Sequence, residues 1–169
     1  MKLTTILNVL LATGASLAAP TDPAAVLNLE TRDLIPRAGD DYPYKNSCNT
    51  GNGFDRWGFF KCDCTSFVAR RLNDVKKIKF TNWYKGKHWG NAGIWDNAAR
   101  ASGVSINKTP KKGAVAQTDK SGSGKGHVAR VRSVSKDGKK VTVEEYNYRK
   151  DKYGTRTVAK EDFQWYIHL

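Results

Sequence analysis

The residue best suited to chemistry in this sequence is a cysteine at the start of a helical pattern. Cys64 opens the run CTSFVARRLNDV, whose apolar residues recur at the spacing of one face of an amphipathic helix: Phe67, Val68, Leu72 and Val75. A helix N-terminus and a neighbouring imidazole together lower a thiol pKa from about 8.5 into a range of roughly 3.5 to 7.5. Cys64 is therefore the candidate nucleophile, provided that a histidine lies beside it.

Three histidines could supply that imidazole, and the sequence favours His127 as the base. His168 is one residue from the C-terminus, where fraying makes accurate positioning difficult. His88 lies in the polar and aromatic segment YKGKHWGN. His127 instead begins a strand-like alternating run, directly after the Gly/Ser-rich residues 118–126, which we expect to form a mobile loop.

A cysteine–histidine pair needs a third group that orients the imidazole through its second ring nitrogen. Residues 140–148 alternate between apolar and polar side chains, which predicts a strand. Side chains alternate between the two faces along a strand, so Glu145 and Asn147 share one face. Both are candidates for the orienting group.

The chain has three cysteines, so at least one stays unpaired within the chain. An odd thiol in a secreted protein indicates either an intermolecular bond or a reactive nucleophile. A Cys62–Cys64 bond would close a strained ring, and a Cys48–Cys64 bond would consume the candidate nucleophile. We expect the remaining pairing, a disulfide between Cys48 and Cys62, whose spacing allows a short loop to fold back.

The remaining patterns predict helices first and antiparallel strands after them. A second helix is expected over residues 91–101, with Ile94, Trp95 and Ala98 buried and Gly103 after its end. Alternation predicts strands over residues 114–116, 127–134, 140–148 and 163–169. The predicted fold class is α+β, with the helices packed against one face of a small antiparallel sheet.

The turn at Asp137-Gly138 joins the two strands that carry the candidate site. A two-residue loop would put His127 and Glu145 on opposite faces and would set apolar Val131 against a charged residue. We therefore expect a three-residue loop with a bulge and a positive φ at Gly138. In this register the opposed residues are Val131 and Val143, Arg130 and Glu144, Ala129 and Glu145, His127 and Asn147, and Ser135 and Lys139.

Six segments, taken in order, resemble one known family: DDYPYK, DRWGFFKCDCTSFVARRLN, HWGNAGIWDNAARASGV, TPKKGAVAQ, GHVARVRSV and VTVEEYNY. The family is the CHAP domain, the cysteine- and histidine-dependent amidohydrolase/peptidase family of papain-like fold. The resemblance covers nearly all of residues 40–169. It implies N-terminal helices packed on a small antiparallel β-sheet in a papain-like arrangement.

The resemblance also implies a function, that of a peptidoglycan hydrolase without a metal or other cofactor. The activity would be that of an N-acetylmuramoyl-L-alanine amidase or of an endopeptidase that cuts stem or cross-bridge peptides. The family's nucleophile, base and two supporting residues correspond to Cys64, His127, Glu145 and Asn147. One position departs from the family, because Asp63 stands where Gln usually precedes the nucleophile. A carboxylate there would repel a developing oxyanion, so we expect either that Asp63 points away or that backbone N–H groups are the main donors.

The N-terminal part of the chain indicates targeting and processing. Met1-Lys2, an apolar run over residues 3–17 and the small residues Ser16 and Ala18 predict a signal peptide over residues 1–18. Residues 19–37 have no sustained period and end on Arg37, which predicts a pro-segment. The catalytic CHAP domain is then expected over residues 38–169, secreted to the extracellular space.

The chain is strongly basic, with 29 Lys and Arg against 16 Asp and Glu and a formal net charge of +13. Such an excess attracts nucleic acid, anionic lipid or the anionic polymers of a bacterial wall, whereas a merely solubilising surface is the plain alternative. With the family resemblance, we expect a monomer that binds cell-wall peptidoglycan and anionic wall polymers, and neither nucleic acid nor membrane.

A second class of function stays open, that of a non-catalytic cationic effector or wall-binding protein on the same fold. Asp63 is the best argument for it. A nuclease would need carboxylate-rich metal geometry around a histidine, which the sequence does not offer. Four aromatic residues could stack on sugars or peptide, although aromatics at this density more often form core: Trp83, Tyr84, Trp89 and Trp95. Of these, Trp89 is the candidate substrate-binding residue.

Overall fold

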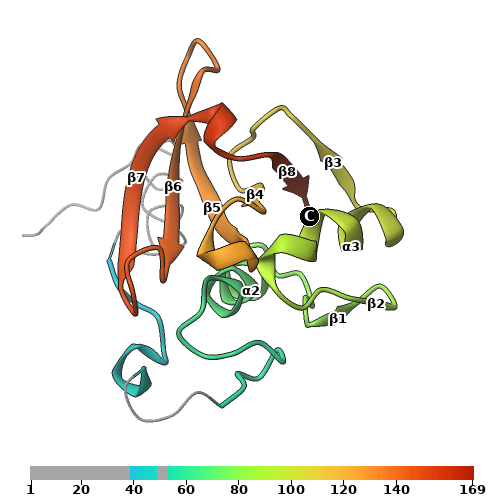
Figure 1. Cartoon of the computed structure of the whole chain (residues 1–169), viewed down its shortest axis with the longest axis vertical. Coiled ribbons are helices and arrows are strands. Elements are labelled where there is room, and N and C mark those ends of the chain that lie inside the picture. Colours follow the sequence, from blue (N-terminus) through green and yellow to red (C-terminus); the bar gives the residue numbers. More distant parts are fainter. Residues whose placement is uncertain (1–38, 49–52) are drawn as a thin grey trace, which may run out of the picture. The chain divides into compact units, whose positions relative to one another are not determined.

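The structure, a computed structural model, describes residues 39–48 and 53–169, so the expected signal peptide and pro-segment lie outside the described residues. Within the described part the helices are α2 (Cys64–Asp74) and α3 (Trp95–Ala101) (Figure 1). Short 3-10 turns connect other elements: η1 (Lys45–Ser47), η2 (Ala92–Ile94), η3 (Gly122–Gly124) and η4 (Lys160–Asp162). No helix of the described residues is both long and apolar enough to cross a bilayer.

A six-stranded antiparallel sheet forms the body of the fold. Its strands, in spatial order, are β3 (Ser105–Asn107), β8 (Trp165–His168), β4 (Val115–Thr118), β5 (His127–Val134), β6 (Lys140–Tyr146) and β7 (Tyr153–Ala159). A separate small hairpin pairs β1 (Trp83–Tyr84) with β2 (Lys87–His88). Strands β5, β6 and β7 follow one another as a meander, so the strand that starts at His127 is internal to the sheet (Figure 1).

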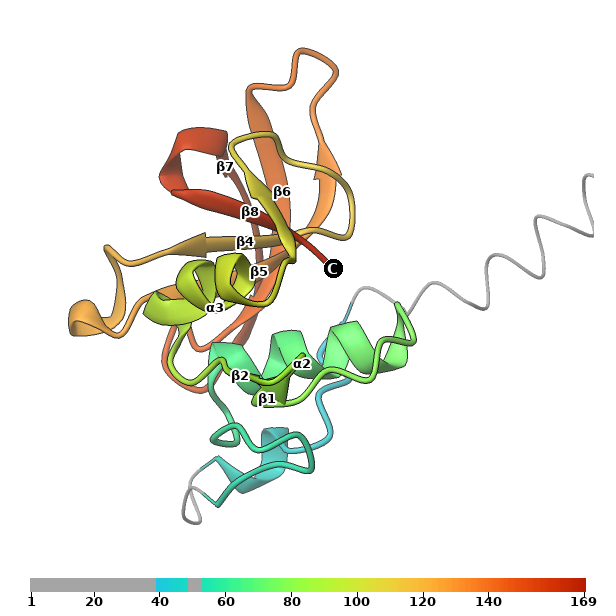
Figure 2. The same cartoon turned by 90° about the vertical axis from the view of Figure 1, so that its right-hand side faces the viewer.

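Alternation along the strands separates two hydrophobic clusters, one on each face of the sheet. Val128 and Tyr146 pack with the buried side of α2, which includes Phe67. Ala129 and Val143, which point the other way, belong to the second cluster. Figure 2 shows α2 running beneath the strands and α3 beside β4 and β8. The α+β class and the packing of helices on a small antiparallel sheet are thus as predicted.

Most of the predicted elements are present, with two kinds of difference. The second helix is divided into η2 and α3, and Ile94 at the junction is 42% exposed instead of buried. The sequence did not predict β3, β7 or the β1–β2 hairpin. Three of these strands have only two or three residues, too few for a period to emerge, and the run YGTRTVA of β7 is interrupted by Gly154.

The β5–β6 hairpin has the predicted register beside the candidate site. Val131 pairs with Val143 and Arg130 with Glu144. His127 and Glu145 therefore lie on one face of the sheet, as expected, and their side chains are in contact.

The turn of this hairpin differs from the prediction. The Ser135 N–H donates to the carbonyl of Lys140, so Ser135 does not pair with Lys139. The extra residue forms an irregularity between Val131 and Ser133, while Gly138 keeps the predicted positive φ of 69°. The Ser135 hydroxyl accepts a hydrogen bond from the Lys140 N–H at 2.9 Å. The loop that this bond closes is longer than the three-residue loop predicted from the alternation of the strands.

Candidate active site

Cys64 is the first residue of α2, and the chain turns sharply just before it. Cys62 is left-handed, with φ 68°, and Asp63 is extended before the helix starts. The Cys62 N–H donates to the hydroxyl of buried Tyr42 at 2.9 Å, and the same hydroxyl lies 2.6 Å from that of Ser66. Tyr42 thus connects the turn to the first turn of α2 and fixes where Cys64 emerges.

The three cysteines are arranged as expected from the sequence. Cys48 and Cys62 form a disulfide, and Cys64 is a free, partly exposed thiol. The disulfide ties the segment after η1 to the turn before α2. The only unpaired sulfur of the three is therefore the one at the helix N-terminus, where the positive end of the helix dipole favours negative charge.

His127 is the first residue of β5 and brings its ring to this end of α2. Its Nε2 lies 2.8 Å from Oε2 of Glu145 on the neighbouring strand, and the two residues are 4% and 2% exposed. Cys64 and His127 line one cleft, and interaction with the Cys64 sulfur raises the pKa of the imidazole against the effect of burial. Because Nε2 is taken by the carboxylate, the other ring nitrogen is the one left for the thiol. The structure thus brings together Cys64, His127 and Glu145.

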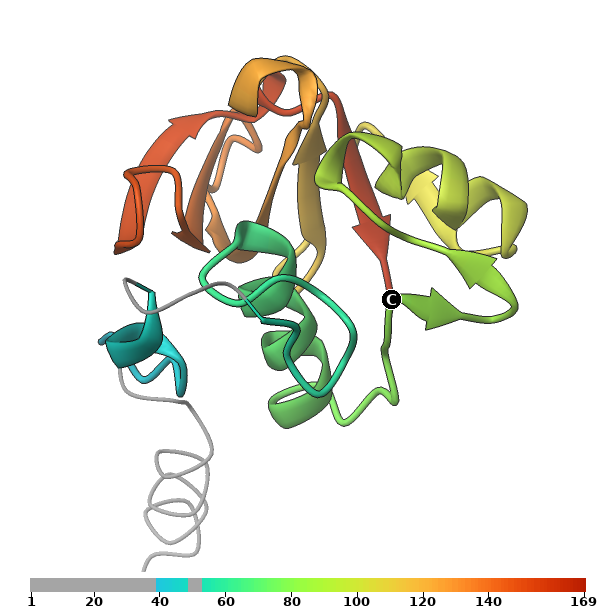
Figure 3. The ribbon, with the colours of Figure 1, turned by 60° about the horizontal axis from the view of Figure 1, so that its bottom comes forward.

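These three groups meet at the end of the sheet and not over its helix-covered face. Glu144 faces α2, where it forms an ion pair of 3.1 Å with buried Arg71, so Glu145 projects to the opposite side. His127 projects to that same side because Val128 packs against the helix. Cys64 is the first residue of α2, the helix that lies below the central strands in Figure 3.

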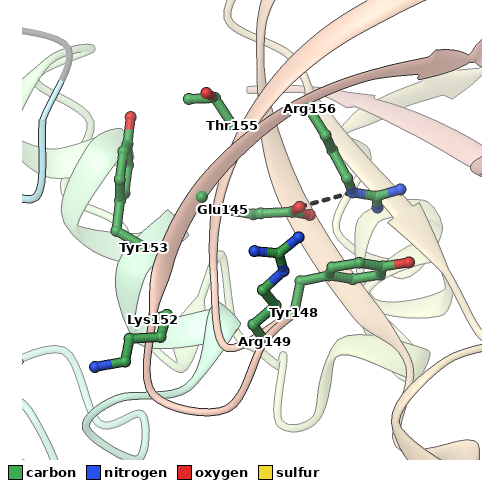
Figure 4. Close-up of a pocket in the computed structure, with 8 residues that line it drawn as sticks. Glu145, Tyr148, Arg149, Lys152, Tyr153, Thr155 and Arg156 are labelled. Atoms are coloured by element: carbon green, nitrogen blue, oxygen red, sulfur yellow. Dashed lines mark hydrogen bonds and ion pairs between the residues drawn. The ribbon is translucent and has the colours of Figure 1, made fainter.

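Arg156 and Tyr148 complete the surroundings of His127, and no sequence pattern predicted a role for either residue. Arg156 on β7 donates from Nε to Oε1 of Glu145 at 2.6 Å (Figure 4). Its guanidinium carbon lies 4.0 Å from the ring centre of Tyr148, which in turn meets the His127 ring edge to face at 5.6 Å. Had the alternating run YGTRTVA been assigned as a strand, it would have placed Arg156 next to the strand of Glu145.

Charges in this cluster favour a protonated His127 and an ionised Glu145. Burial alone would lower the pKa of His127, but its hydrogen bonds and charge interactions with Cys64 and Glu145 raise it from 6.5 to about 9. Burial alone would raise the pKa of Glu145, but hydrogen bonds with His127 and Arg156 hold it below its usual 4.5. At neutral pH the imidazolium therefore lies between the sulfur and a carboxylate.

A cleft of about 290 Å³ opens over the thiol. Its walls come from the turn before α2, from η2, from the loop before β5 and from the segment after β6; they include Asp63, Asn91, Ala92, Lys125, Asn147 and Tyr148. A second hollow of about 410 Å³ also reaches His127, Ser121 and Tyr148 and extends to Arg156 and Asp162. Tyr148 is 54% exposed and lines both spaces.

The loop before β5, expected to be mobile, is held at its C-terminal end. The Gly93 N–H donates to the carbonyl of Lys125 at 2.8 Å. Gly126 has φ 79°, and a Cβ there would lie 2.3 Å from the backbone nitrogen of Gly93. Only glycine permits this approach, which fixes the chain immediately before His127.

The sequence model of the CHAP domain matches residues 50–147, more than half of the chain. The chain belongs to the CHAP domain family. Staphylococcal secretory antigen SsaA of Staphylococcus aureus (strain NCTC 8325 / PS 47) is 38% identical over 108 residues, which cover 63% of this chain and 38% of the relative. Staphylococcal secretory antigen ssaA2 of the same strain is 49% identical over 85 residues, 50% of this chain and 27% of the relative. The chain thus matches well under half the length of these relatives.

A solved structure agrees with this fold. The CHAP domain resembles the crystal structure of an N-acetylmuramoyl-L-alanine amidase from Staphylococcus aureus, with a TM-score of 0.53 over 83% of this chain and 39% of that chain. The sequence identity of 23% supports a shared fold and no more.

Asn147 lines the cleft of this CHAP domain but does not meet the imidazole opposite which it was predicted. Strand β6 ends at Tyr146, and Asn147 follows with a left-handed φ of 63°. That conformation takes its side chain out of the alternation of the strand. Its amide donates to Oδ1 of Asp63 at 2.9 Å. Burial raises the pKa of Asp63, and the hydrogen bond from Asn147 acts in the opposite direction.

The prediction that Trp89 binds substrate is wrong. Its side chain is 0% exposed, and its ring packs edge to face on Phe80 and Trp95. The indole N–H donates to the Tyr84 carbonyl at 3.3 Å, which satisfies its polar atom inside the core. Among the four aromatic residues considered, Trp83 is the exposed one, at 69%.

Among the residues that the structure describes, one set of side chains lies close enough to share a metal ion: Cys48, Cys62 and Asp151. The two cysteines are joined to each other, so they offer no thiolate to a metal. What the described site can do chemically follows from its thiol and imidazole. These groups can exchange a proton with each other, and the cleft leaves room for a substrate beside them.

Proposed function

We propose that this CHAP domain is a cysteine hydrolase that cleaves amide bonds in bacterial peptidoglycan, as an N-acetylmuramoyl-L-alanine amidase or an endopeptidase. One arrangement carries the proposal: a free thiol at a helix N-terminus shares a cleft with an imidazole whose Nε2 lies 2.8 Å from a carboxylate. This order of groups activates a nucleophile for acyl transfer and holds the base in place.

In the proposed reaction, Cys64 is the nucleophile and His127 is both acid and base. With the proton on His127, the thiolate attacks the amide carbonyl carbon and forms a C–S bond. The tetrahedral intermediate collapses, the C–N bond breaks, and the imidazolium gives its proton to the departing amine. His127 then takes a proton from water as the water attacks the thioester, which releases the carboxylic acid and regenerates the thiolate.

Backbone N–H groups at the start of α2 are the proposed donors to the oxyanion. The first N–H groups of a helix have no partners within it and point out of its N-terminus. The side chain of Asp63 forms no cap bond to them. We infer that Asn147 supports the site through Asp63, because its amide donates to Oδ1 of that carboxyl group and offsets part of its negative charge.

Three further observations support a cell-wall substrate and an extracellular location. The relatives include proteins named secretory antigens, and the solved neighbour is named an N-acetylmuramoyl-L-alanine amidase. The N-terminal sequence fits a signal peptide over residues 1–18 and a pro-segment over residues 19–37. The charge of +13 would concentrate the protein on anionic wall polymers.

Zymography on purified bacterial walls tests the proposal. We expect clearing by the wild type and by Ser133→Ala, a control at an exposed position of β5, and loss of clearing by at least about a thousandfold in Cys64→Ser. Equal clearing by Cys64→Ser would reject the cysteine mechanism. Walls that the wild type binds without clearing would favour the alternative, a non-catalytic wall-binding protein, for which Asp63 is the supporting feature.

Mass analysis of the released fragments identifies the bond that is cut. An amidase separates the stem peptide from muramic acid and leaves a new N-terminal amine on the first residue of the stem. An endopeptidase leaves the stem attached to the glycan and creates a new amine within the peptide or the cross-bridge.

A further inference from the structure

The β1–β2 hairpin exposes an aromatic pair that the core does not use. Trp83, 69% exposed, lies directly opposite His88 in the hairpin register, and the two ring centres are 5.1 Å apart. His88 is exposed as well. The neighbouring Trp89 points inward and forms core, so the hairpin divides its aromatic residues between the interior and the surface.

This aromatic pair continues toward the cleft. A Cβ built on Gly90 would meet both the His88 ring and the Ile94 side chain at 3.0 Å, so these two side chains flank Gly90. Ile94 is 42% exposed. We call Trp83, His88 and Ile94 the Trp83 surface. Asn91 of the cleft wall is three residues from His88, a distance of at most about 10 Å along the chain.

The hairpin and the chain before it carry an excess of positive charge. Between Asp74 and Asp96 the sequence has no acidic residue and five lysines: Lys76, Lys77, Lys79, Lys85 and Lys87. Lys85 and Lys87 belong to the hairpin itself and are exposed. Figures 2 and 3 both show the hairpin on the side of the fold where α3 lies. A ligand here therefore meets aromatic faces together with positive charge.

We propose that the Trp83 surface binds the glycan strand of the peptidoglycan molecule whose peptide enters the Cys64 cleft. The inference rests on the proposed function and adds a second contact to it. Flat aromatic faces pack on the C–H faces of pyranose rings, and the carboxylates along the polymer complement the lysines. Because stem peptides are attached to the glycan, a surface adjoining the cleft can hold the strand while the peptide occupies the site.

The shape of the hairpin favours a polysaccharide over a lipid bilayer. A segment that inserts into a membrane presents a broad apolar face to the acyl chains. Here the residues between the two strands are Lys85 and Gly86, both exposed, whereas Trp83 and Ile94 are separate apolar side chains beside a polar cleft.

The test measures binding without cleavage, in protein that carries Cys64→Ala. The probe is peptidoglycan sacculi freed of teichoic acids with hydrofluoric acid, and binding is followed by sedimentation. We expect Trp83→Ala to weaken binding by about threefold to tenfold, the range that one aromatic contact supplies. The matched control is Phe54→Ala, which removes another exposed aromatic ring, 60% exposed and stacked on Phe60; its binding should stay within about twofold of the parent.

The contribution of charge is tested with a second matched pair. Lys85→Glu/Lys87→Glu should weaken binding to the sacculi more than Lys136→Glu/Lys139→Glu, which reverses the same number of charges in the exposed β5–β6 turn. The difference should shrink as salt is added.

Two results would overturn the proposal. One is unchanged binding of Trp83→Ala to the sacculi. The other is a dependence on Trp83 that appears with vesicles of phosphatidylglycerol and phosphatidylethanolamine but not with sacculi. None of these binding measurements requires catalysis, so their results are independent of the zymography. Binding through Trp83 by a wild type that clears no walls would support the surface and reject the hydrolase.

Discussion

His127 lies between a thiol and a carboxylate, and the charges of these neighbours set the pH range in which it can act. The imidazolium is stabilised until the pH approaches about 9. Glu145 contributes to this directly, and Arg156 contributes through Glu145. Each contribution can be removed by a substitution that replaces the charge with a neutral amide.

Replacing Glu145 with Gln removes a charge that raises the pKa of His127. The pKa of His127 should therefore fall, and the imidazolium should be lost at lower pH. We expect the alkaline limb of kcat/KM, near pH 9 in the wild type, to move to lower pH. At pH 7, kcat/KM should fall by about tenfold to a hundredfold. Asp74→Asn, which makes the same change of charge at the other end of α2, should leave the profile in place.

Thermal unfolding gives an independent readout of the same variant. A histidine with a raised pKa contributes stability in full below pH 6.5 and loses it as the pH rises through about 9. In Glu145→Gln this loss should begin at lower pH. If the wild type and Glu145→Gln have the same alkaline limb of kcat/KM and the same dependence of unfolding on pH, Glu145 does not orient His127.

Arg156 is expected to act as a positioning residue, because it touches Glu145 and Tyr148 and not the thiol. Arg156→Gln should let the pKa of Glu145 rise, so the acidic limb of kcat/KM should move to higher pH. We expect kcat to fall about tenfold with little change in KM, as for other residues that orient a catalytic group. Arg156→Lys keeps the charge and should restore the acidic limb. A purely structural role would lower the melting temperature of both variants without moving the limb.

At the scale of elements, strand parity predicted where Glu145 lies but not where Asn147 lies. Parity holds while a strand lasts, and β6 ends one residue before Asn147. The same limit explains the β5–β6 turn. There the Ser135 hydroxyl closes a longer loop than predicted, and the irregularity near Arg132 brings the pairing back to the predicted register. Arg156 was missed because its strand was not predicted. Local periodicity thus places the residues inside elements, whereas side-chain hydrogen bonds decide what happens at their ends.

The loop that leads into β5 provides a test at this scale. Gly126→Ala would put a Cβ 2.3 Å from the Gly93 nitrogen and 2.5 Å from its Cα, and both are backbone atoms that cannot simply rotate away. The start of β5 should shift and carry His127 with it, so we expect kcat to fall by about tenfold to a hundredfold. Gly124→Ala has a similar positive φ, 85°, with nothing within 4 Å.

Gly124→Ala is therefore the matched control for backbone strain, which costs about 1–2 kcal/mol in an L-residue with left-handed dihedrals. It should lower stability by that amount and leave kcat nearly unchanged. Equal losses of kcat in the two variants would mean that strain, and not the approach to Gly93, accounts for the effect.

At the scale of the whole molecule, the α+β class and the meeting of Cys64 with His127 could be predicted from the sequence. The clustering of aromatic residues predicted a core, but not which ring would stay outside it. Trp83 and Trp89 are six residues apart in one polar segment, and only the pairing of two short strands separates an exposed ring from a buried one. The segment over residues 39–48 is joined to the rest by side chains distant in sequence, which no local pattern records. Asp41 binds Arg70 and Arg71 of α2, and Tyr42 binds Ser66.

The disulfide adds a covalent tie between this N-terminal segment and the turn that carries Cys64. The bonded cysteines are 14 residues apart, and a loop of that size stabilises a fold by about 3 kcal/mol, chiefly by restricting the unfolded chain. We expect Cys48→Ser/Cys62→Ser to unfold roughly 10 °C below the wild type under oxidising conditions. Both proteins should carry one alkylatable thiol, that of Cys64. In dithiothreitol the wild type should unfold at the temperature of the variant, because reduction removes the same constraint. If the wild type without reductant has a melting temperature no higher than that of the variant, the Cys48–Cys62 bond does not stabilise the fold. If the Cys64 thiol fails to react in the native wild type, its assignment as the free cysteine is wrong.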